Sequence, residues 1–202
     1  MANRSFLVLK GSADPNEHFS DDSIIVGASW IVPVLWFSLF DWDDRLMRTG
    51  TFLSDPPDDE PLPADDDRVW VEDLTYPVLL TRTEVAQRRA AAGRKAFLTF
   101  FPAQFGTYYD RWEVLIAGLD SPYIVLDAGE IWGMGTPDAF DKLLLEGVRA
   151  WAKQERSDWI KLCEQTGMVI NSQTGQIEEE SVLPGRMYGY YWMRPLPWET
   201  KE

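Results

Sequence analysis

The chain has 202 residues, of which 45% are hydrophobic, and 33 acidic against 19 basic residues give it a formal charge of −14. This length and apolar content predict one well-packed globular domain over residues 1–202. The negative charge argues against nucleic acid and against anionic lipid as partners, because both require a basic face.

Cysteine content and the two apolar runs bear on the compartment. Cys163 is the only cysteine, so it has no intramolecular disulfide partner, and a reducing compartment is favoured. The apolar run at residues 6–9 ends at Lys10, which is too early for a signal peptide. The uncharged run at residues 24–40 contains Pro33 and is shorter than the roughly 20 residues of a membrane helix. We therefore expect a cytoplasmic protein with no membrane partner.

The first predicted elements are two strands. Residues 4–10 form an apolar run of strand character, and residues 11–16 follow with a dense turn signal. Residues 24–26 are β-branched and favour an extended conformation.

A helix is predicted next, from Val34 to about Arg48. Pro33 precedes it at a position where proline is tolerated in the first turn of a helix. Apolar residues then recur at helical spacing at Leu35, Leu39, Trp42 and Leu46, with Trp36 and Phe40 beside them. Such a pattern indicates a helix that is buried on more than one side.

Residues 54–67 have a different character and predict an acidic, proline-rich loop within the domain. They contain seven acids and four prolines, and Leu62 is their only large apolar residue. The seven acids are Asp55, Asp58, Asp59, Glu60, Asp65, Asp66 and Asp67.

The second half of the chain predicts further strands and helices. Residues 69–71 and 76–80 favour extended structure, and Thr81 with Glu84 resembles a capping box for a basic helix. A short helix over 110–118 and a core strand over 123–126 follow, then a long helix from Pro137 and a restart near Ser157 that runs to Gly167. A hairpin loop at 171–175 and a last strand at 187–193 complete the prediction. The fold class is α+β, with a mixed or mainly antiparallel sheet covered by several helices.

No catalytic residue, cofactor or metal ligand is predicted. His18 is the only histidine, so His18 and Cys163 cannot supply the four ligands of a zinc site. Gly133-Met-Gly135 resembles a phosphate-binding turn, but Asp138 stands where a third glycine belongs. None of the acid clusters has the spacing of a calcium loop. Paired carboxylates for glycoside hydrolysis stay open, because some pair among 33 acids will always lie at a suitable distance.

Ten tryptophans are the most unusual feature of the composition. Trp36, Trp151 and Trp159 lie on apolar patterns and are predicted to be core residues. Trp132, Trp192 and Trp198 lie beside loops or near the C-terminus, where large rings with a polar N–H anchor protein interfaces. Stacking on a sugar is the competing use of these rings.

The opening Met1-Ala-Asn-Arg-Ser5 with its following apolar strand, and then Trp30-Ile-Val-Pro-Val-Leu-Trp36, resembles a group of small bacterial immunity or toxin-associated proteins. A looser similarity extends to residues 123–127. The resemblance implies a cytosolic protein that neutralises a cognate toxin by direct binding and has no catalytic residues. The acidic loop would then face a basic toxin and speed its capture. A carboxylate-dependent hydrolase with a tryptophan-lined sugar site and an acidic adaptor subunit are the alternatives.

Overall fold

The computed structural model describes residues 3–53, 71–132, 137–190, 196 and 198. Five strands form one sheet in the order β2-β1-β5-β4-β3, and every neighbouring pair is antiparallel. The strands are β1 (Arg4–Lys10), β2 (Ile24–Ser29), β3 (Arg45–Leu53), β4 (Val71–Arg82) and β5 (Tyr123–Asp127). The α+β class and the mainly antiparallel sheet are thereby confirmed.

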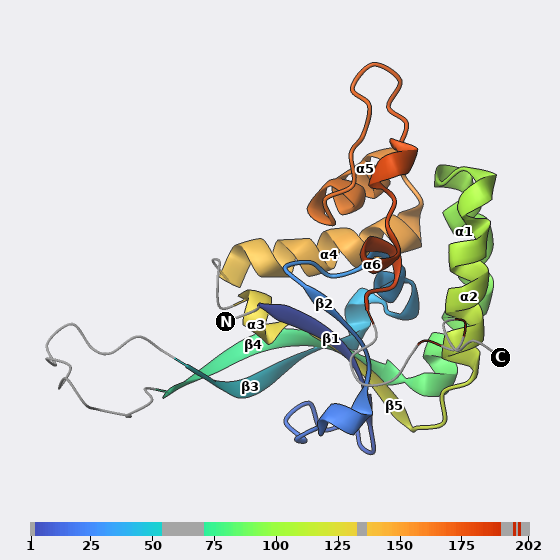
Figure 1. Ribbon diagram of the computed structural model, residues 1–202. Coiled ribbons are helices and arrows are strands. Elements are labelled where there is room, and N and C mark those ends of the chain that lie inside the picture. Colours follow the sequence, from blue (N-terminus) through green and yellow to red (C-terminus); the bar gives the residue numbers. More distant parts are fainter. Residues whose placement is uncertain (1–2, 54–70, 133–136, 191–195, 197, 199–202) are drawn as a thin grey trace, which may run out of the picture.

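The longer helices lie against one face of this sheet, and the segment with the 3-10 helix at residues 21–23 lies on the other side (Figure 1). The α-helices are α1 (Thr83–Phe100), α2 (Gly106–Ala117), α3 (Gly129–Trp132), α4 (Pro137–Lys153), α5 (Arg156–Gln165) and α6 (Pro184–Met187). The 3-10 helices are η1 (Asp21–Ser23), η2 (Val34–Leu39), η3 (Trp42–Asp44), η4 (Ala103–Phe105) and η5 (Glu179–Ser181). The main core lies between the helices and the sheet residues that face them, such as Leu7, Leu79 and Leu126. Because side chains alternate along a strand, the residues next to these in the sequence point to the opposite face of the sheet.

Buried tryptophans occupy the centre of the main core, as predicted for Trp36, Trp151 and Trp159. The indole N–H groups of two of these tryptophans form hydrogen bonds inside the core. Trp36 Nε1 donates to the carbonyl of Tyr188 at 2.9 Å, and Trp151 Nε1 donates to that of Val34 at 3.1 Å. Since an unpaired buried N–H costs free energy, these bonds allow the rings to be fully buried.

The predicted helix from Val34 to about Arg48 is wrong beyond its first turns. The segment forms the short 3-10 helices η2 and η3, and then the strand β3 begins at Arg45. Every residue of η2 is buried, so its apolar pattern reflects burial on all sides rather than a helical stripe. Leu46, predicted to lie on that stripe, is 37% exposed on β3. Pairing with β4 along the whole of β3 decides the conformation there.

The strands β3 and β4 extend beyond the rest of the sheet as a two-stranded ribbon (Figure 1). Pairing between β4 and β5 covers only Leu79 to Arg82, whereas pairing between β3 and β4 runs back to Val71. Pro77 lies in this extension, beyond the last residue that pairs with β5. A proline cannot donate to a ladder, so it is tolerated in β4 at a place where the β5 side is unpaired.

Two smaller predictions are also corrected. Thr81 pairs with Ile124 inside β4, and α1 begins at Thr83 with no side-chain cap, so the predicted capping box is absent. Residues 187–190 contribute the end of α6 and one isolated bridge between Gly27 and Tyr190 rather than a strand. Residues 191–193 lie outside the described part.

The long helix α4 is confirmed from Pro137, with Phe140, Leu144, Val148 and Trp151 buried on one face. The hairpin loop is confirmed by the bridge between Ile170 and Ile177. Across the described residues, no helix is both long and apolar enough to cross a membrane.

Candidate functional site

A recess of about 630 Å³ lies on the sheet face opposite the helices. Residues from the five strands and α3 form its floor and one wall, and the segment between β1 and β2 forms the other wall. Its lining residues are Arg4, Phe6, Asn16, His18, Phe19, Asp21, Ile24, Arg48, Thr49, Gly50, Thr51, Phe52, Tyr76, Asp127 and Glu130. Figure 1 shows the segment that carries η1 on the side of the sheet away from α4.

This wall, residues 11–23, is fixed to the sheet at two points. The ammonium group of Lys10, at the end of β1, donates to the carbonyls of Asp14 at 2.6 Å and Pro15 at 3.0 Å. The backbone N–H of Thr49 on β3 donates to Oδ1 of Asn16 at 2.8 Å. The segment therefore crosses the sheet from β1 to β3 before it returns to β2, and the recess is already shaped on this side.

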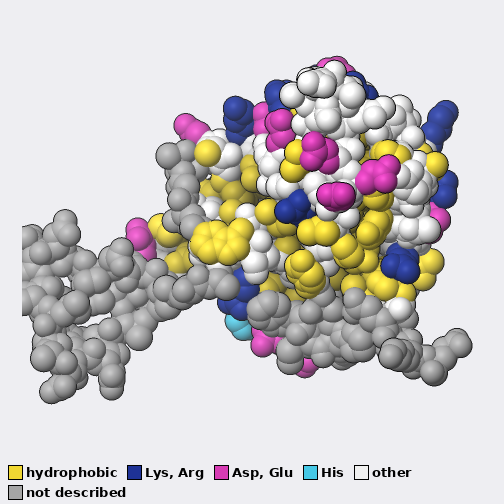
Figure 2. All heavy atoms as spheres, turned by 45° about the horizontal axis from the view of Figure 1, so that its top comes forward, with side chains coloured by type: hydrophobic (Ala, Val, Ile, Leu, Met, Phe, Trp, Pro, Cys, Tyr) yellow, Lys and Arg dark blue, Asp and Glu magenta, His cyan; other side chains and the backbone are white. Residues whose placement is uncertain are grey.

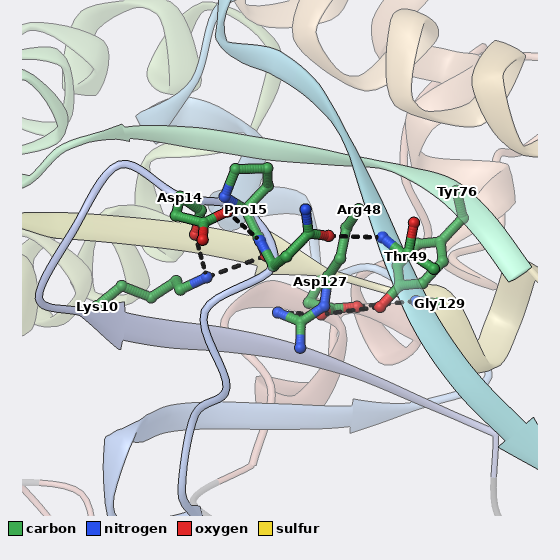
Figure 3. A network of polar contacts seen from close by, with 9 residues as sticks. Lys10, Asp14, Pro15, Arg48, Thr49, Tyr76, Asp127 and Gly129 are labelled. Atoms are coloured by element: carbon green, nitrogen blue, oxygen red, sulfur yellow. Dashed lines mark hydrogen bonds and ion pairs between the residues drawn. The ribbon is translucent and has the colours of Figure 1, made fainter. Parts of the chain in front are cut away.

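A buried polar cluster forms the floor of the recess (Figure 3). Arg48 Nη1 on β3 lies 3.3 Å from Asp127 Oδ2 on β5, and both side chains are about nine-tenths buried. Tyr76 on β4 donates its hydroxyl to the same Oδ2 at 3.2 Å, and the Gly129 N–H donates to Oδ1 at 3.0 Å. The carboxylate of Asp127 thus accepts two hydrogen bonds and forms an ion pair with Arg48.

Burial changes the acidity of this cluster. Desolvation raises the pKa of the Asp127 carboxyl above its ordinary value, and the Arg48 charge and the Gly129 N–H oppose part of that rise. Desolvation also raises the pKa of the Tyr76 phenol, and the charge of Asp127 adds to this effect. Tyr76 therefore stays a neutral donor to Asp127.

The guanidinium of Arg48 has more donors than its described surroundings use. Its Nε and Nη1 atoms are buried, and neither forms a hydrogen bond with a described residue; the Nη1 contact with Asp127 is an ion pair without hydrogen-bond geometry. The ring of Phe19 covers one face of the guanidinium, with Cζ 4.9 Å from the ring centroid. A buried donor without an acceptor costs about 1–3 kcal/mol. An acceptor that entered the recess would offset this cost.

A second arginine stands at the rim. Arg4 on β1 forms a two-pronged ion pair with Glu130 on α3, with Nη2–Oε1 at 2.9 Å and Nε–Oε2 at 3.1 Å. Gly129 lets α3 approach closely, because a Cβ there would lie 2.5 Å from Cζ of Tyr76. The position of Glu130 therefore depends on a glycine that directly precedes it.

Two of the three carboxylates that line the recess are engaged in ion pairs, and this bears on its chemistry. Glycoside hydrolysis needs two carboxyl groups on either side of the bond that breaks. Asp127 and Glu130 are each held by an arginine, and His18 lies in the exposed wall. The described residues contain no group of three or more His, Cys, Asp or Glu side chains placed to hold a metal ion. The arrangement supplies hydrogen-bond donors and aromatic walls, which are features of a binding site.

The second candidate surface is the outer edge of β3. Because β3 is the last strand of the sheet, its outward N–H and C=O groups face no other strand. The Thr49 N–H points outward to Asn16, so by alternation the backbone groups of Met47 and Thr51 also point outward. Neither of these two N–H groups bonds to a described residue. Leu46 and Met47 expose 37% and 43% of their surface beside this edge.

Only two of the sequence-predicted site residues lie in the described part. Trp132 is partly buried at the end of α3, 6.0 Å from the Tyr76 ring, and its Nε1 has no described acceptor. Trp198 packs edge-on against Tyr188 at 5.2 Å, with Arg111 over its ring. Trp132 therefore packs against Tyr76 of the recess lining without lining the recess itself, whereas Tyr188 and Arg111, which contact Trp198, are not lining residues. The acids Asp55, Asp58, Asp59, Glu60, Asp65, Asp66 and Asp67, together with Trp192, lie outside the described residues.

Sequence reasoning missed other residues at the surface. Trp30 and Tyr190 are 58% and 62% exposed, the two most exposed aromatic residues of the described chain. Figure 2 shows that hydrophobic side chains reach the surface in patches between charged ones on the face it presents. Trp30 has a positive φ of 68°, which is unusual for a bulky residue. No local pattern in the sequence marks that conformation.

No protein-family model, curated protein or solved structure matches this chain.

Proposed function

We propose that this protein acts by binding a partner protein, as a cytoplasmic, immunity-type neutraliser of a basic bacterial toxin. The observation that carries the proposal is the outer edge of β3, where the outward N–H groups of Met47 and Thr51 bond to no described residue, although the Thr49 N–H between them donates to Asn16. An added strand from a partner pairs with such an edge through main-chain hydrogen bonds.

The projection of the ribbon supports this role. The part of β4 that precedes Leu79 pairs only with β3 within the sheet. Figure 1 shows this two-stranded ribbon extending away from the helices. An approaching chain therefore reaches this ribbon away from the helices, although pairing along the whole edge requires that Asn16 leave the Thr49 N–H. The exposed side chains of Leu46 and Met47 supply apolar area on both faces of the edge.

Charge supports a basic partner. The chain has a formal charge of −14, and the connection between β3 and β4 contains the seven acids of residues 54–67. Glu72 and Asp73, which follow it on β4, are exposed. Complementary charge raises the association rate of two proteins by orders of magnitude at low salt. Fast capture suits a protein that must neutralise a toxin before it acts.

The test begins with capture of the partner of the tagged protein from its host at low salt. Expression of the captured partner alone should stop growth, and co-expression of this chain should restore it. The decisive variant is Met47→Pro, because proline removes an outward N–H without breaking the ladder to β4. We expect Met47→Pro to lose protection while it stays folded, and the matched Met47→Thr variant to keep it.

Two results would reject the proposal. One is that no captured partner is toxic or is relieved by this chain. The other is that Met47→Pro protects as well as the unmodified chain, in which case the partner binds elsewhere.

A further inference from the structure

We propose that the recess on the open face of the sheet is a binding site for a small neutral aromatic amide, whose carbonyl oxygen accepts a hydrogen bond from Arg48. This inference goes beyond the proposed function and does not depend on it, because it rests on side chains that line the recess rather than on the outward backbone groups of β3.

The first argument is the state of Arg48. A guanidinium has five N–H donors in one plane, and it remains charged in proteins. Asp127 interacts with it through Nη1, and Phe19 covers one face, but the buried Nε and Nη1 have no hydrogen-bond acceptor among the described residues. These donors require an oxygen that approaches in the guanidinium plane. A carbonyl oxygen that enters the recess can accept from one of these donors, because Nε–H and the Nη1–H groups point along different edges of the guanidinium.

The second argument is the shape and nature of the walls. Four aromatic side chains line the recess: Phe6, Phe19, Phe52 and Tyr76. Phe52 and Tyr76 form an edge-to-face pair at 5.4 Å, and Phe6 and Phe19 lie 6.5 Å apart. Aromatic walls favour a flat ring as ligand. The volume of about 630 Å³ falls within the range of about 300–1,000 Å³ that is typical of small-molecule sites.

The third argument is charge, and it decides between ligands of the same shape. The lining contains two arginines and three acidic residues, Asp21, Asp127 and Glu130, so its formal charge is −1 with His18 counted as neutral. An anion would meet this negative balance, in a protein of charge −14. A cation would meet the buried guanidinium at the floor. A neutral group with an acceptor oxygen avoids both penalties.

The recess is also held ready for a ligand. Lys10 and Asn16 fix residues 11–23 over the sheet, so the wall that carries Phe19 is in place without a ligand. At the opposite wall, Gly50 leaves room beside Tyr76, since a Cβ there would lie 3.0 Å from Cε1 of that ring. A pre-formed site loses less conformational freedom on binding.

The test compares three probes that share one ring and differ in charge: benzamide, benzoate and benzamidinium. Each is titrated into ¹⁵N-labelled full-length protein, and the backbone amide signals and the Arg48 Nε–H signal are followed by NMR. We expect benzamide to shift the signals of Arg48, Thr49 and Tyr76 in a saturable manner. Benzoate and benzamidinium should bind at least tenfold more weakly.

Variants separate the recess from other sites. Arg48→Lys, checked for an intact NMR spectrum, should weaken benzamide binding at least tenfold, because an ammonium lacks the planar donors. Phe52→Ala removes a half-buried wall without touching the ion pair and should weaken binding at least threefold, which keeps the proposal testable if Arg48→Lys does not fold. Val114→Ala, at an exposed position on α2, is the control and should bind as the unmodified chain does.

The proposal is overturned if benzamide leaves the recess signals unchanged up to its solubility limit, or if it shifts signals elsewhere. It is equally overturned if benzoate or benzamidinium binds as tightly as benzamide, because the charge argument would then be wrong. Unchanged affinity in both Arg48→Lys and Phe52→Ala would also reject it.

Discussion

Arg48 on β3 forms a buried ion pair with Asp127 on β5, with Nη1 and Oδ2 3.3 Å apart, although β4 lies between the two strands. Tyr76 on the intervening β4 pairs with Arg48 across the ladder and donates its hydroxyl to Asp127. One polar cluster thus joins three adjacent strands on the face that the helices leave uncovered.

Removal of one member of this cluster should destabilise the fold. Arg48→Met leaves the Asp127 carboxylate buried without its cation, which typically costs about 3–5 kcal/mol in the free energy of unfolding. Urea denaturation followed by circular dichroism measures the loss. The double variant Arg48→Met/Asp127→Asn should recover most of it, because the amide carries no charge and its oxygen can still accept from the Gly129 N–H.

The matched control for that experiment is Arg94→Met. Arg94 forms an ion pair with Asp110 at 2.7 Å, but both side chains are about half exposed. Solvent screens such a pair, so the urea midpoint should stay unchanged. A double variant as unstable as the sum of the single ones would contradict the assignment of a coupled buried pair.

The raised pKa of Asp127 predicts a specific pH dependence. An acid whose pKa is higher in the folded state binds its proton more tightly there, so its contribution to stability is largest at low pH. That contribution falls as the pH rises from the ordinary value of 3.8 through the folded-state pKa. The stability advantage of the unmodified chain over Asp127→Asn should therefore shrink with rising pH. Urea titrations of both proteins in steps from acidic to neutral pH check this, and a growing advantage would refute it.

Gly147 on α4 should resist substitution. In an open helix, alanine would be about 1 kcal/mol more favourable than glycine. Here a Cβ would lie 2.3 Å from Cε1 of Phe37, a fully buried residue of η2 that has no free direction in which to move. We expect Gly147→Ala to lower the free energy of unfolding by about 1–3 kcal/mol, since overpacking outweighs propensity. Thermal denaturation measures the change, with Gly118→Ala as control because its nearest neighbour would be 3.6 Å away. Equal melting temperatures for the two variants would show that Phe37 and η2 shift to accommodate the added Cβ.

The acids between β3 and β4 should control the rate of capture of a toxin. Replacement of Asp58, Asp59, Asp65 and Asp66 by Asn should slow association with a basic partner and flatten its dependence on salt, because long-range attraction is lost. Stopped-flow or surface-based kinetics over a range of salt concentrations provide the measurement. Unchanged association rates would remove these acids from the proposed function.

The recess could not be predicted from the local sequence, because no local pattern shows that its residues come together. In the sequence, Lys10 only marks the end of an apolar run, His18 lies in a polar turn, and Arg48 lies at the end of a predicted helix. His18 and Arg48 come together in the recess because of the strand order and because residues 11–23, which Lys10 anchors, cross the sheet. One signal pointed towards β3: Thr49, Gly50 and Thr51 together disfavour a helix, whereas threonine favours a strand.

The sequence alone predicts helix α4, because the spacing of the apolar residues from Phe140 to Trp151 places them on one face of a helix. The strands β1 and β5 were equally visible as short apolar runs. Tertiary structure alone decided that residues 45–53 are a strand, since their hydrogen bonds are made to β4 across a long connection rather than within the segment. It alone also brought Arg48 to Asp127, because strand pairing is non-local and a sequence records periodicity but not which strands become neighbours.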